Sequence, residues 1–177
     1  MIERAFLRLV DDEDETVRLL AADLLNMIES EALAAQTDAI VSLMDGYSTG
    51  ELECVAQAIG ELDPATIDGL AGVLLHCLAD DDEVVRLAAL KPFGKLEPRM
   101  LVAHASPLVE RLLDDEEDYG VRQAAAEILS VLEPVTLVEF ADGLEHANGS
   151  AVLRILELAR AGKDLDESES ESESESE

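Results

Sequence analysis

Apolar residues recur at helical spacing along most of this chain. The segment from Val121 to Leu132 shows the pattern clearly, and polar residues fill most of the positions between the apolar ones. Its apolar positions are Val121, Ala124, Ala125, Ile128, Leu129 and Leu132. This spacing follows the 3.6-residue period of an α-helix and gives the helix one apolar face. The pattern predicts an all-α fold.

The helical pattern repeats along the chain. Similar segments begin at residues 17, 51, 85 and 121, which are 34, 34 and 36 residues apart. They are VRLLAADLLNMIES, ELECVAQAIGELDP, VRLAALKPFGKLEP and VRQAAAEILSVLEP, and a weaker fifth copy is VLRILELARAGK. An earlier helix is expected before each, at about residues 2–10, 33–45, 65–79, 99–113 and 135–147. One such hairpin cannot bury its apolar face alone, so stacked neighbours are expected. The sequence predicts an α-solenoid of about five antiparallel helical hairpins.

Acidic turns connect the two helices of several hairpins. They are DDEDE, DDDE and DDEED, and a fourth connection is DGYSTGE. Asp or Ser in these turns can cap the helix that follows, whose N-terminus favours negative charge. Asp63-Pro64 and Ser106-Pro107 are typical of a cap followed by proline at the first helical position.

The repeats resemble the HEAT repeat family over about residues 2–162. The likeness is carried by PLVERLLDDEEDYGVRQAAAEILSVLEP and by LADDDEVVRLAALKPFGKL, in which an Asp-containing turn precedes V-R-x-x-A-A-x-x-L or a close variant. Repeat two departs from it, with Leu52 in place of the arginine. The resemblance implies that the arginines at this position pair with turn aspartates and tie one repeat to the next. These ladder residues are Arg18, Arg86, Arg122 and Arg154.

The charge of the chain is strongly acidic. The 177 residues hold 41 Asp and Glu against 12 Lys and Arg, which gives a net charge of −29. The tail from Asp164 holds eight acids and no base, so the body carries 33 acids against 12 bases, or −21. Self-repulsion on this scale destabilises a compact state in dilute salt. Heavy use of Asp and Glu, few lysines and small apolar residues resemble the proteins of salt-accumulating halophilic archaea, from which we expect this protein to come; the alternative is an acidic protein from a mesophile. Residues 1–163 are predicted to form the repeat domain and residues 164–177 a disordered acidic Ser/Glu tail.

Sequence motifs for catalysis are missing. The chain has no GxxxxGK, GxGxxG, HExxH or GxSxG, and its three histidines occupy non-equivalent repeat positions. Cys54 and Cys77 form no CxxC, so two reduced thiols are expected. No apolar run is long enough to span a membrane and the N-terminus does not resemble a signal peptide, so we expect a cytoplasmic protein. An acidic body is poorly suited to nucleic acid. No catalytic, metal or cofactor site is predicted.

Basic residues are concentrated in one stretch of the third repeat. Lys91 and Lys95 are two of the chain's three lysines, and Arg99 follows them. They lie four residues apart and therefore share one helix face, while Pro92 predicts a kink. By the repeat alignment Lys91 matches Asp23, Gln57 and Glu127. The second helices of HEAT arrays line the concave surface, so these positions are the predicted partner-binding site: Lys91, Lys95, Arg99, Gln57, Glu127 and Asp23. The other hypothesis is that the lysines only bridge to Glu61 or Glu127 on neighbouring repeats.

The function expected from these observations is protein binding without catalysis. The protein would be a scaffold or adaptor that binds a protein partner on its concave face, without nucleic acid or membrane, and as a monomer. The alternative, which also follows from the resemblance, is an enzyme accessory or cofactor-attachment module of the bilin-lyase-like HEAT class.

Overall fold

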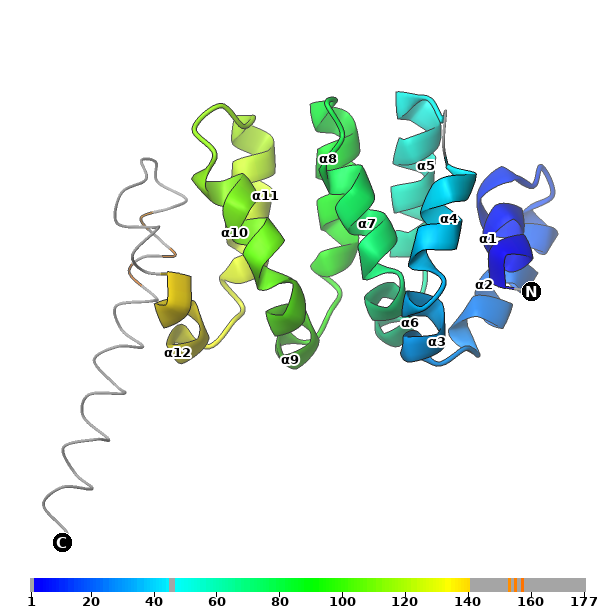
Figure 1. Ribbon diagram of the computed structural model, residues 1–177, viewed down its shortest axis with the longest axis horizontal. Helices are drawn as coiled ribbons and strands as arrows, with labels where there is room; N and C mark the ends of the chain where they lie inside the picture. Colours follow the sequence, from blue (N-terminus) through cyan, green and yellow to red (C-terminus); the bar gives the residue numbers. More distant parts are fainter. Residues whose placement is uncertain (1, 45–46, 141–152, 154, 156, 158–177) are drawn as a thin grey trace, which may run out of the picture. The chain divides into compact units, whose positions relative to one another are not determined.

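The computed structural model describes residues 2–44, 47–140, 153, 155 and 157. Within these residues the elements are α-helices and short 3-10 helices, and there is no strand (Figure 1). The predicted all-α class is therefore confirmed. The fifth predicted repeat, Arg154 and the predicted tail boundary at residue 163 lie outside the described residues or largely so.

The chain divides into two compact units, Met1–Glu97 and Pro98–Glu177. The first unit holds eight α-helices among its described residues, and the described residues of the second form four α-helices of 4–11 residues and two 3-10 turns. In the first unit they are α1 (Ile2–Asp11), α2 (Glu15–Asn26), α3 (Ser30–Ala34), α4 (Thr37–Leu43), α5 (Thr49–Gly60), α6 (Pro64–Gly69), α7 (Ala71–Leu78) and α8 (Glu83–Phe93). In the second they are α9 (Pro98–Leu101), η1 (Val102–His104), α10 (Ala105–Leu113), α11 (Tyr119–Leu129), α12 (Pro134–Leu137) and η2 (Val138–Phe140).

The longest helices recur at the spacing of the sequence repeat. Helices α2, α5, α8 and α11 begin at residues 15, 49, 83 and 119, which are 34, 34 and 36 residues apart. Each begins after an acidic or hydroxyl residue, as the turn sequences predict. The Oδ1 atoms of Asp14 and Asp82 accept hydrogen bonds of 2.8 Å from backbone amides two residues on, and Asp118 accepts one of 2.7 Å from Gly120. Before α5, Ser48 forms a capping box with Glu51.

The first helices of the hairpins differ from the prediction. Instead of one continuous helix, repeats two to four each have two shorter segments, joined at Gln36, Leu70 and His104. These three residues are 34 residues apart, and all have φ between −102° and −112° with ψ between 0° and 8°. Such backbone angles leave the α-helical region, so the helix is interrupted once in each repeat. Figure 1 shows α3 and α6 as short segments below α4 and α7.

Two predicted helix starts have different outcomes. Asp63 caps α6 and accepts a hydrogen bond from the Thr66 amide at 2.8 Å, with Pro64 at the first helical position as predicted. The same prediction for Ser106-Pro107 is wrong. Helix α10 begins at Ala105 after the break at His104, so these two residues lie within its first turn.

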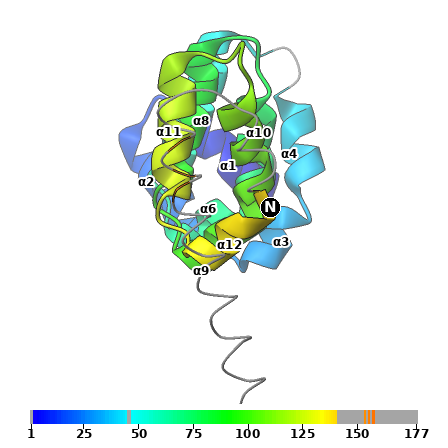
Figure 2. The same cartoon turned by 90° about the vertical axis from the view of Figure 1, so that its left-hand side faces the viewer.

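Successive hairpins of the first unit pack helix against helix. Helix α5 packs on α8, α4 on α7 and α3 on α6. Figure 2 shows α8 and α4 on opposite sides of this unit. Close approach at α3 and α6 depends on Gly69, where an added Cβ would lie 2.7 Å from the Ser30 carbonyl oxygen. The core between these helices is mostly aliphatic, with the fully buried Leu74 and one aromatic ring, that of the fully buried Phe93.

The second unit contains a hairpin of its own. Helix α10 packs against α11 through buried aliphatic residues, among them Leu108, Leu112 and Val121. In the turn between them, Arg111 pairs with Glu117 at 3.4 Å. Glu117 is only 7% exposed, and its other carboxylate oxygen accepts a hydrogen bond from the Asp118 amide at 2.8 Å. The buried charge is therefore both paired and hydrogen-bonded, as a stable fold requires.

Candidate functional site

The two predicted lysines on and after α8 have different surroundings. Lys91 is exposed in the last turn of α8 and has no hydrogen-bond or ion-pair partner among the described residues. The Lys95 ammonium donates a hydrogen bond to the Gly60 carbonyl, at the C-terminal end of α5. A cation is favourable there because the last carbonyls of a helix are unpaired and carry partial negative charge. Lys95 therefore bridges two repeats, through a backbone carbonyl rather than through Glu61.

The opposite side of α8 is buried. Ala88, Ala89, Phe93 and Leu96 are all at most 5% exposed. Pro92 is buried as well, and its ring lies beside Gly60, where an added Cβ would meet Pro92 Cγ at 3.4 Å. Helix α8 ends at Phe93, one residue after the proline. Lys91 thus lies on a helix that is held firmly against α5.

A hollow of about 430 Å³ lies between α2 and α5, at a predicted site residue. Gln57 lines it together with the exposed Cys54, and its amide donates a hydrogen bond of 2.8 Å to Glu53. Leu19 contributes an apolar side chain that is 61% exposed. The complete lining is Leu9, Val10, Arg18, Leu19, Ala22, Cys54, Gln57, Ala58 and Glu61. The hollow offers both apolar and polar contacts to a binding partner.

The other predicted site residues are exposed but distributed over both units. Asp23 lies on α2 in the first unit. Arg99 lies on α9 and Glu127 on α11, both in the second unit, and Glu127 accepts a hydrogen bond of 2.9 Å from Gln123. The convergence of all six residues on one surface therefore stays a prediction.

Two arginines of the predicted ladder, Arg18 and Arg86, make contacts to their own turns. Arg18 Nη1 donates to the Asp12 carbonyl at 2.8 Å, and Arg86 Nη1 donates to the Asp80 carbonyl at the same distance. Both acceptors lie six residues before the arginine, so the contact repeats with the sequence. These two guanidinium groups help to close the acidic turns through backbone carbonyls. Arg122 is half-buried on α11.

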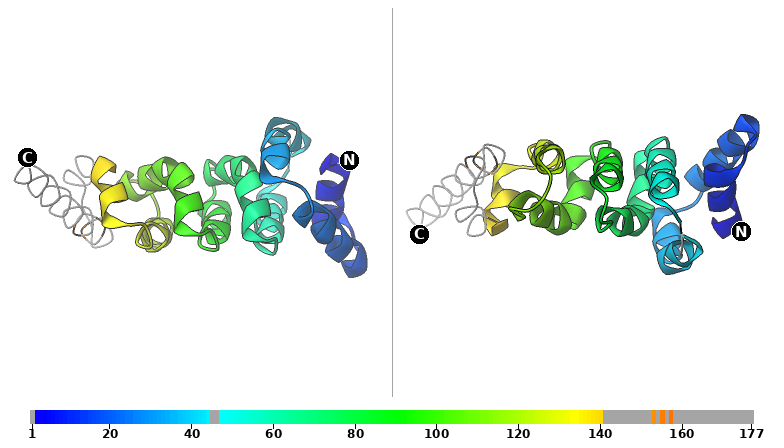
Figure 3. Two further views of the ribbon diagram at one scale, coloured as in Figure 1. Left: turned by 90° about the horizontal axis from the view of Figure 1, so that it is seen from below. Right: turned by 90° about the horizontal axis from the view of Figure 1, so that it is seen from above.

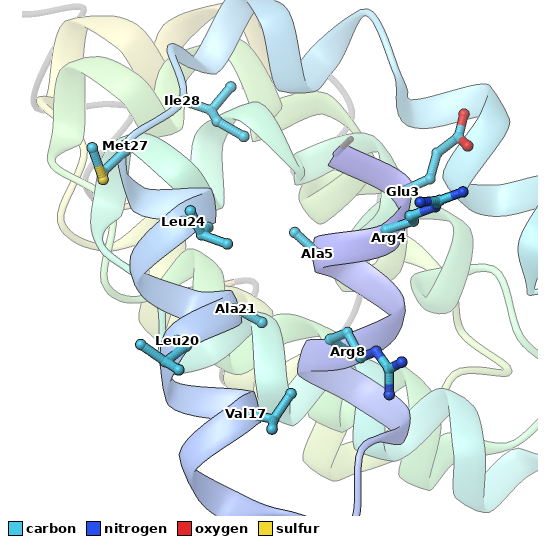
Figure 4. A pocket seen from close by; sticks show the side chains of 10 residues that line it. All are labelled: Glu3, Arg4, Ala5, Arg8, Val17, Leu20, Ala21, Leu24, Met27 and Ile28. Atoms are coloured by element: carbon cyan, nitrogen blue, oxygen red, sulfur yellow. The ribbon is translucent and has the colours of Figure 1, made fainter.

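A larger apolar groove lies between α1 and α2, and the sequence analysis did not predict it. Its volume is about 900 Å³. Figure 4 shows Val17, Ala21, Leu24 and Ile28 directed from α2 toward α1, and Leu20 and Met27 on the outer side of α2. The complete lining is Glu3, Arg4, Ala5, Arg8, Val17, Leu20, Ala21, Leu24, Met27 and Ile28. One signal could have revealed it, because α2 carries apolar residues around more of its circumference than one buried face requires.

The two cysteines differ in exposure. Cys77 is buried in α7, and this burial, reinforced by the nearby Asp80 carboxylate, raises the pKa of its thiol to about 12. Cys54 is exposed in the hollow between α2 and α5. Because the thiolate is the reactive form, Cys54 is the thiol that a reagent or a bound partner can reach.

The remaining chemistry of the described residues is sparse. No group of three His, Cys, Asp or Glu side chains within the described ranges is arranged to hold a metal ion. No helix there is both long and apolar enough to cross a bilayer. No protein-family model matches the chain, and no curated protein matches it.

Proposed function

We propose that this protein is a HEAT-like α-solenoid that binds a protein partner and performs no catalysis. Support for the solenoid comes from three features that recur with one period. The caps of α2, α5 and α8 recur at intervals of 34 residues, as do the breaks at Gln36, Leu70 and His104. The turn contacts of Arg18 and Arg86 are also equivalent in the two repeats.

The observation that carries the binding function is the hollow between α2 and α5. It combines the exposed Leu19 with polar groups of Gln57 and Glu61. Protein interfaces typically combine an apolar centre with polar groups around it. Gln57 comes from α5, the helix on which α8 packs, and Arg18 comes from α2. Lys91 on α8 has no partner among the described residues. We therefore infer that the partner contacts the surface of α2, α5 and α8, which we call the second-helix face.

The partner should place a carboxylate near Lys91. If the protein works in concentrated salt, long-range attraction contributes little because the screening length is about 3 Å at 1 M salt. A direct hydrogen bond to a charged group is still worth roughly 1.5–3 kcal/mol. Lys91 is suited to this role because no described residue occupies its ammonium group. Lys95 is less suited because its ammonium already binds Gly60.

The test compares the two lysines separately. Immobilised protein would be used to capture partners from its source cells at high KCl, with wild type, Lys91→Glu, Lys95→Met and Lys163→Glu in parallel. We expect Lys91→Glu to lose the partner at an unchanged Tm, and Lys95→Met to keep the partner at a lower Tm. Lys163→Glu makes the same charge change elsewhere and should behave as wild type. Retention of the partner by a folded Lys91→Glu protein would contradict the proposed site.

A further inference from the structure

We propose that the groove between α1 and α2 is a self-association surface, occupied by the α1–α2 hairpin of a second copy of this chain. Figure 3 shows this hairpin at one end of the first unit, with α8 at the other end. This proposal does not depend on the second-helix face. It replaces the expectation of a monomer, which rested on the sequence alone.

Among the described residues, no helix covers the apolar surface of α2 as α8 covers α5. Helix α5 packs against α8, and its Val55, Ala56 and Ile59 are fully buried. Helix α2 packs mainly on α1, with a smaller contact to α6. Leu20, Leu24 and Met27 consequently remain 57%, 54% and 82% exposed. Contiguous exposed apolar side chains of this kind typically mark a surface that binds a partner.

The shape of the hairpin is complementary to itself. Leu20 and Met27 lie on the outer side of α2, and Leu24 lies between them on the side of the groove, so the three form an apolar ridge at its edge. The groove of about 900 Å³ runs beside this ridge, between α2 and α1. A two-fold axis would place the ridge of each copy in the groove of the other. Such an isologous contact closes on itself and gives a dimer.

The charges on the α1 side of the groove are also complementary to themselves. Glu3 and Arg4 line it side by side, and both are exposed. Arg4 has no hydrogen-bond or ion-pair partner within the described part of the chain, whereas Arg8 pairs with Asp12. Around a two-fold axis, Glu3 of one copy can face Arg4 of the other, and the pair occurs twice. A partner with charge of a single sign would satisfy only one of the two groups.

A second copy of the chain fits the groove between α1 and α2 better than the chain's own acidic tail does. The sequence ESESESESESE has no apolar side chain to place in the groove. A repeat hairpin is the kind of element that covers α5 within the first unit. The net charge of −29 on each copy opposes association at low salt. Because the screening length falls from about 10 Å at 0.1 M to about 3 Å at 1 M, added salt should promote the dimer.

The first experiment is sedimentation equilibrium of the full chain at about 0.1 M and about 1 M KCl. We expect a reversible dimer whose Kd is lower at the higher salt concentration. Leu24→Glu and Met27→Glu should each raise the Kd roughly tenfold or more, because a carboxylate would be buried in an apolar contact. Leu19→Glu is the matched control, since Leu19 lies on the same helix, is 61% exposed and lines the other hollow. It should leave the Kd unchanged, and circular dichroism would verify that all variants fold.

A charge exchange tests the two-fold geometry. Glu3→Arg and Arg4→Glu should each weaken self-association several-fold, because like charges then meet across the axis. An equimolar mixture of the two variants should recover the dimer, because each pair again has opposite signs. A protein that stays monomeric at both salt concentrations would overturn the proposal and assign the groove to a different partner. Equal weakening by Leu19→Glu and Leu24→Glu, or no recovery in the mixture, would overturn it as well.

Discussion

The contact between successive repeats can be tested by adding one methyl group at Gly69. This residue ends α6, is buried, and faces α3 of the preceding repeat. A Cβ there would lie 2.7 Å from the Ser30 carbonyl oxygen and 2.8 Å from both Ser30 Cα and Leu33 Cβ. Two of these three atoms belong to the backbone, so they cannot move aside as a flexible side chain would. Gly69→Ala should therefore force α3 and α6 apart.

The expected magnitude follows from two opposing effects. Alanine is favoured over glycine within a helix by up to about 1 kcal/mol, and less at a helix end. Overpacking of a well-packed contact costs about 1–3 kcal/mol. The clash should win because the contacts are well below normal separation. A net cost of about 1–2 kcal/mol remains. For a protein of this size each kcal/mol corresponds to about 2–4 °C, so Tm should fall by about 2–8 °C.

Gly50→Ala is the matched control for this experiment. Gly50 lies in the first turn of α5, is exposed, and has no heavy atom within 4 Å of an added Cβ. The same substitution should leave Tm unchanged there or raise it slightly. Thermal unfolding would be followed by far-ultraviolet circular dichroism at one fixed, high KCl concentration. A rise in Tm for Gly69→Ala, matching that of Gly50→Ala, would show that the α3–α6 packing described here is incorrect.

Three further predictions concern thiols, a helix cap and salt. Iodoacetamide at pH 8 should modify Cys54 in the folded protein and leave Cys77 unmodified, because burial raises the Cys77 pKa to about 12. Mass spectrometry that shows both thiols modified at the same rate would contradict the burial of Cys77. Ser48→Ala should lower Tm by about 2–4 °C at pH 7. Hydrogen bonds from Ser48 lower the Glu51 pKa below its ordinary value. The capping contribution to stability is therefore present at neutral pH and is lost as the pH falls through the lowered pKa. A Tm difference between wild type and Ser48→Ala that grows in acid would refute this prediction. Tm should rise markedly from dilute to molar KCl, because salt screens the charge of −29, and a Tm independent of salt would contradict this.

The repeat period and the caps could be predicted because both depend on local sequence. An Asp or Ser before each long helix caps it through its own side chain, and Asp14, Asp82 and Asp118 do so in the structure. The breaks in the first helices had no such signal. They fall at Gln36, Leu70 and His104, three unlike residues of which none is proline or glycine.

The candidate sites were predictable only in part, because exposure depends on neighbouring helices. Gln57 was predicted from its repeat position, and it does line a hollow. The acceptor of Lys95 was expected to be a carboxylate, whereas the structure has the Gly60 carbonyl, which only the packing of α8 on α5 brings into reach. The groove was missed because Leu24 and Leu25 look alike in sequence. Leu25 is fully buried and Leu24 is 54% exposed, since no helix among the described residues covers that side of α2.

Partner binding on the second-helix face is the central claim, and site-specific photo-crosslinking tests it most directly. A photoreactive amino acid would replace Gln57, which lines the hollow between α2 and α5, and separately Ser42, which is exposed on α4. Both proteins would be irradiated in a lysate of the source cells at high KCl, and the adducts identified by mass spectrometry. We predict a defined protein adduct at position 57, absent at position 42 and absent at position 57 when Lys91→Glu is also present. An adduct confined to position 42, or one at position 57 that is unaffected by Lys91→Glu, would contradict the account.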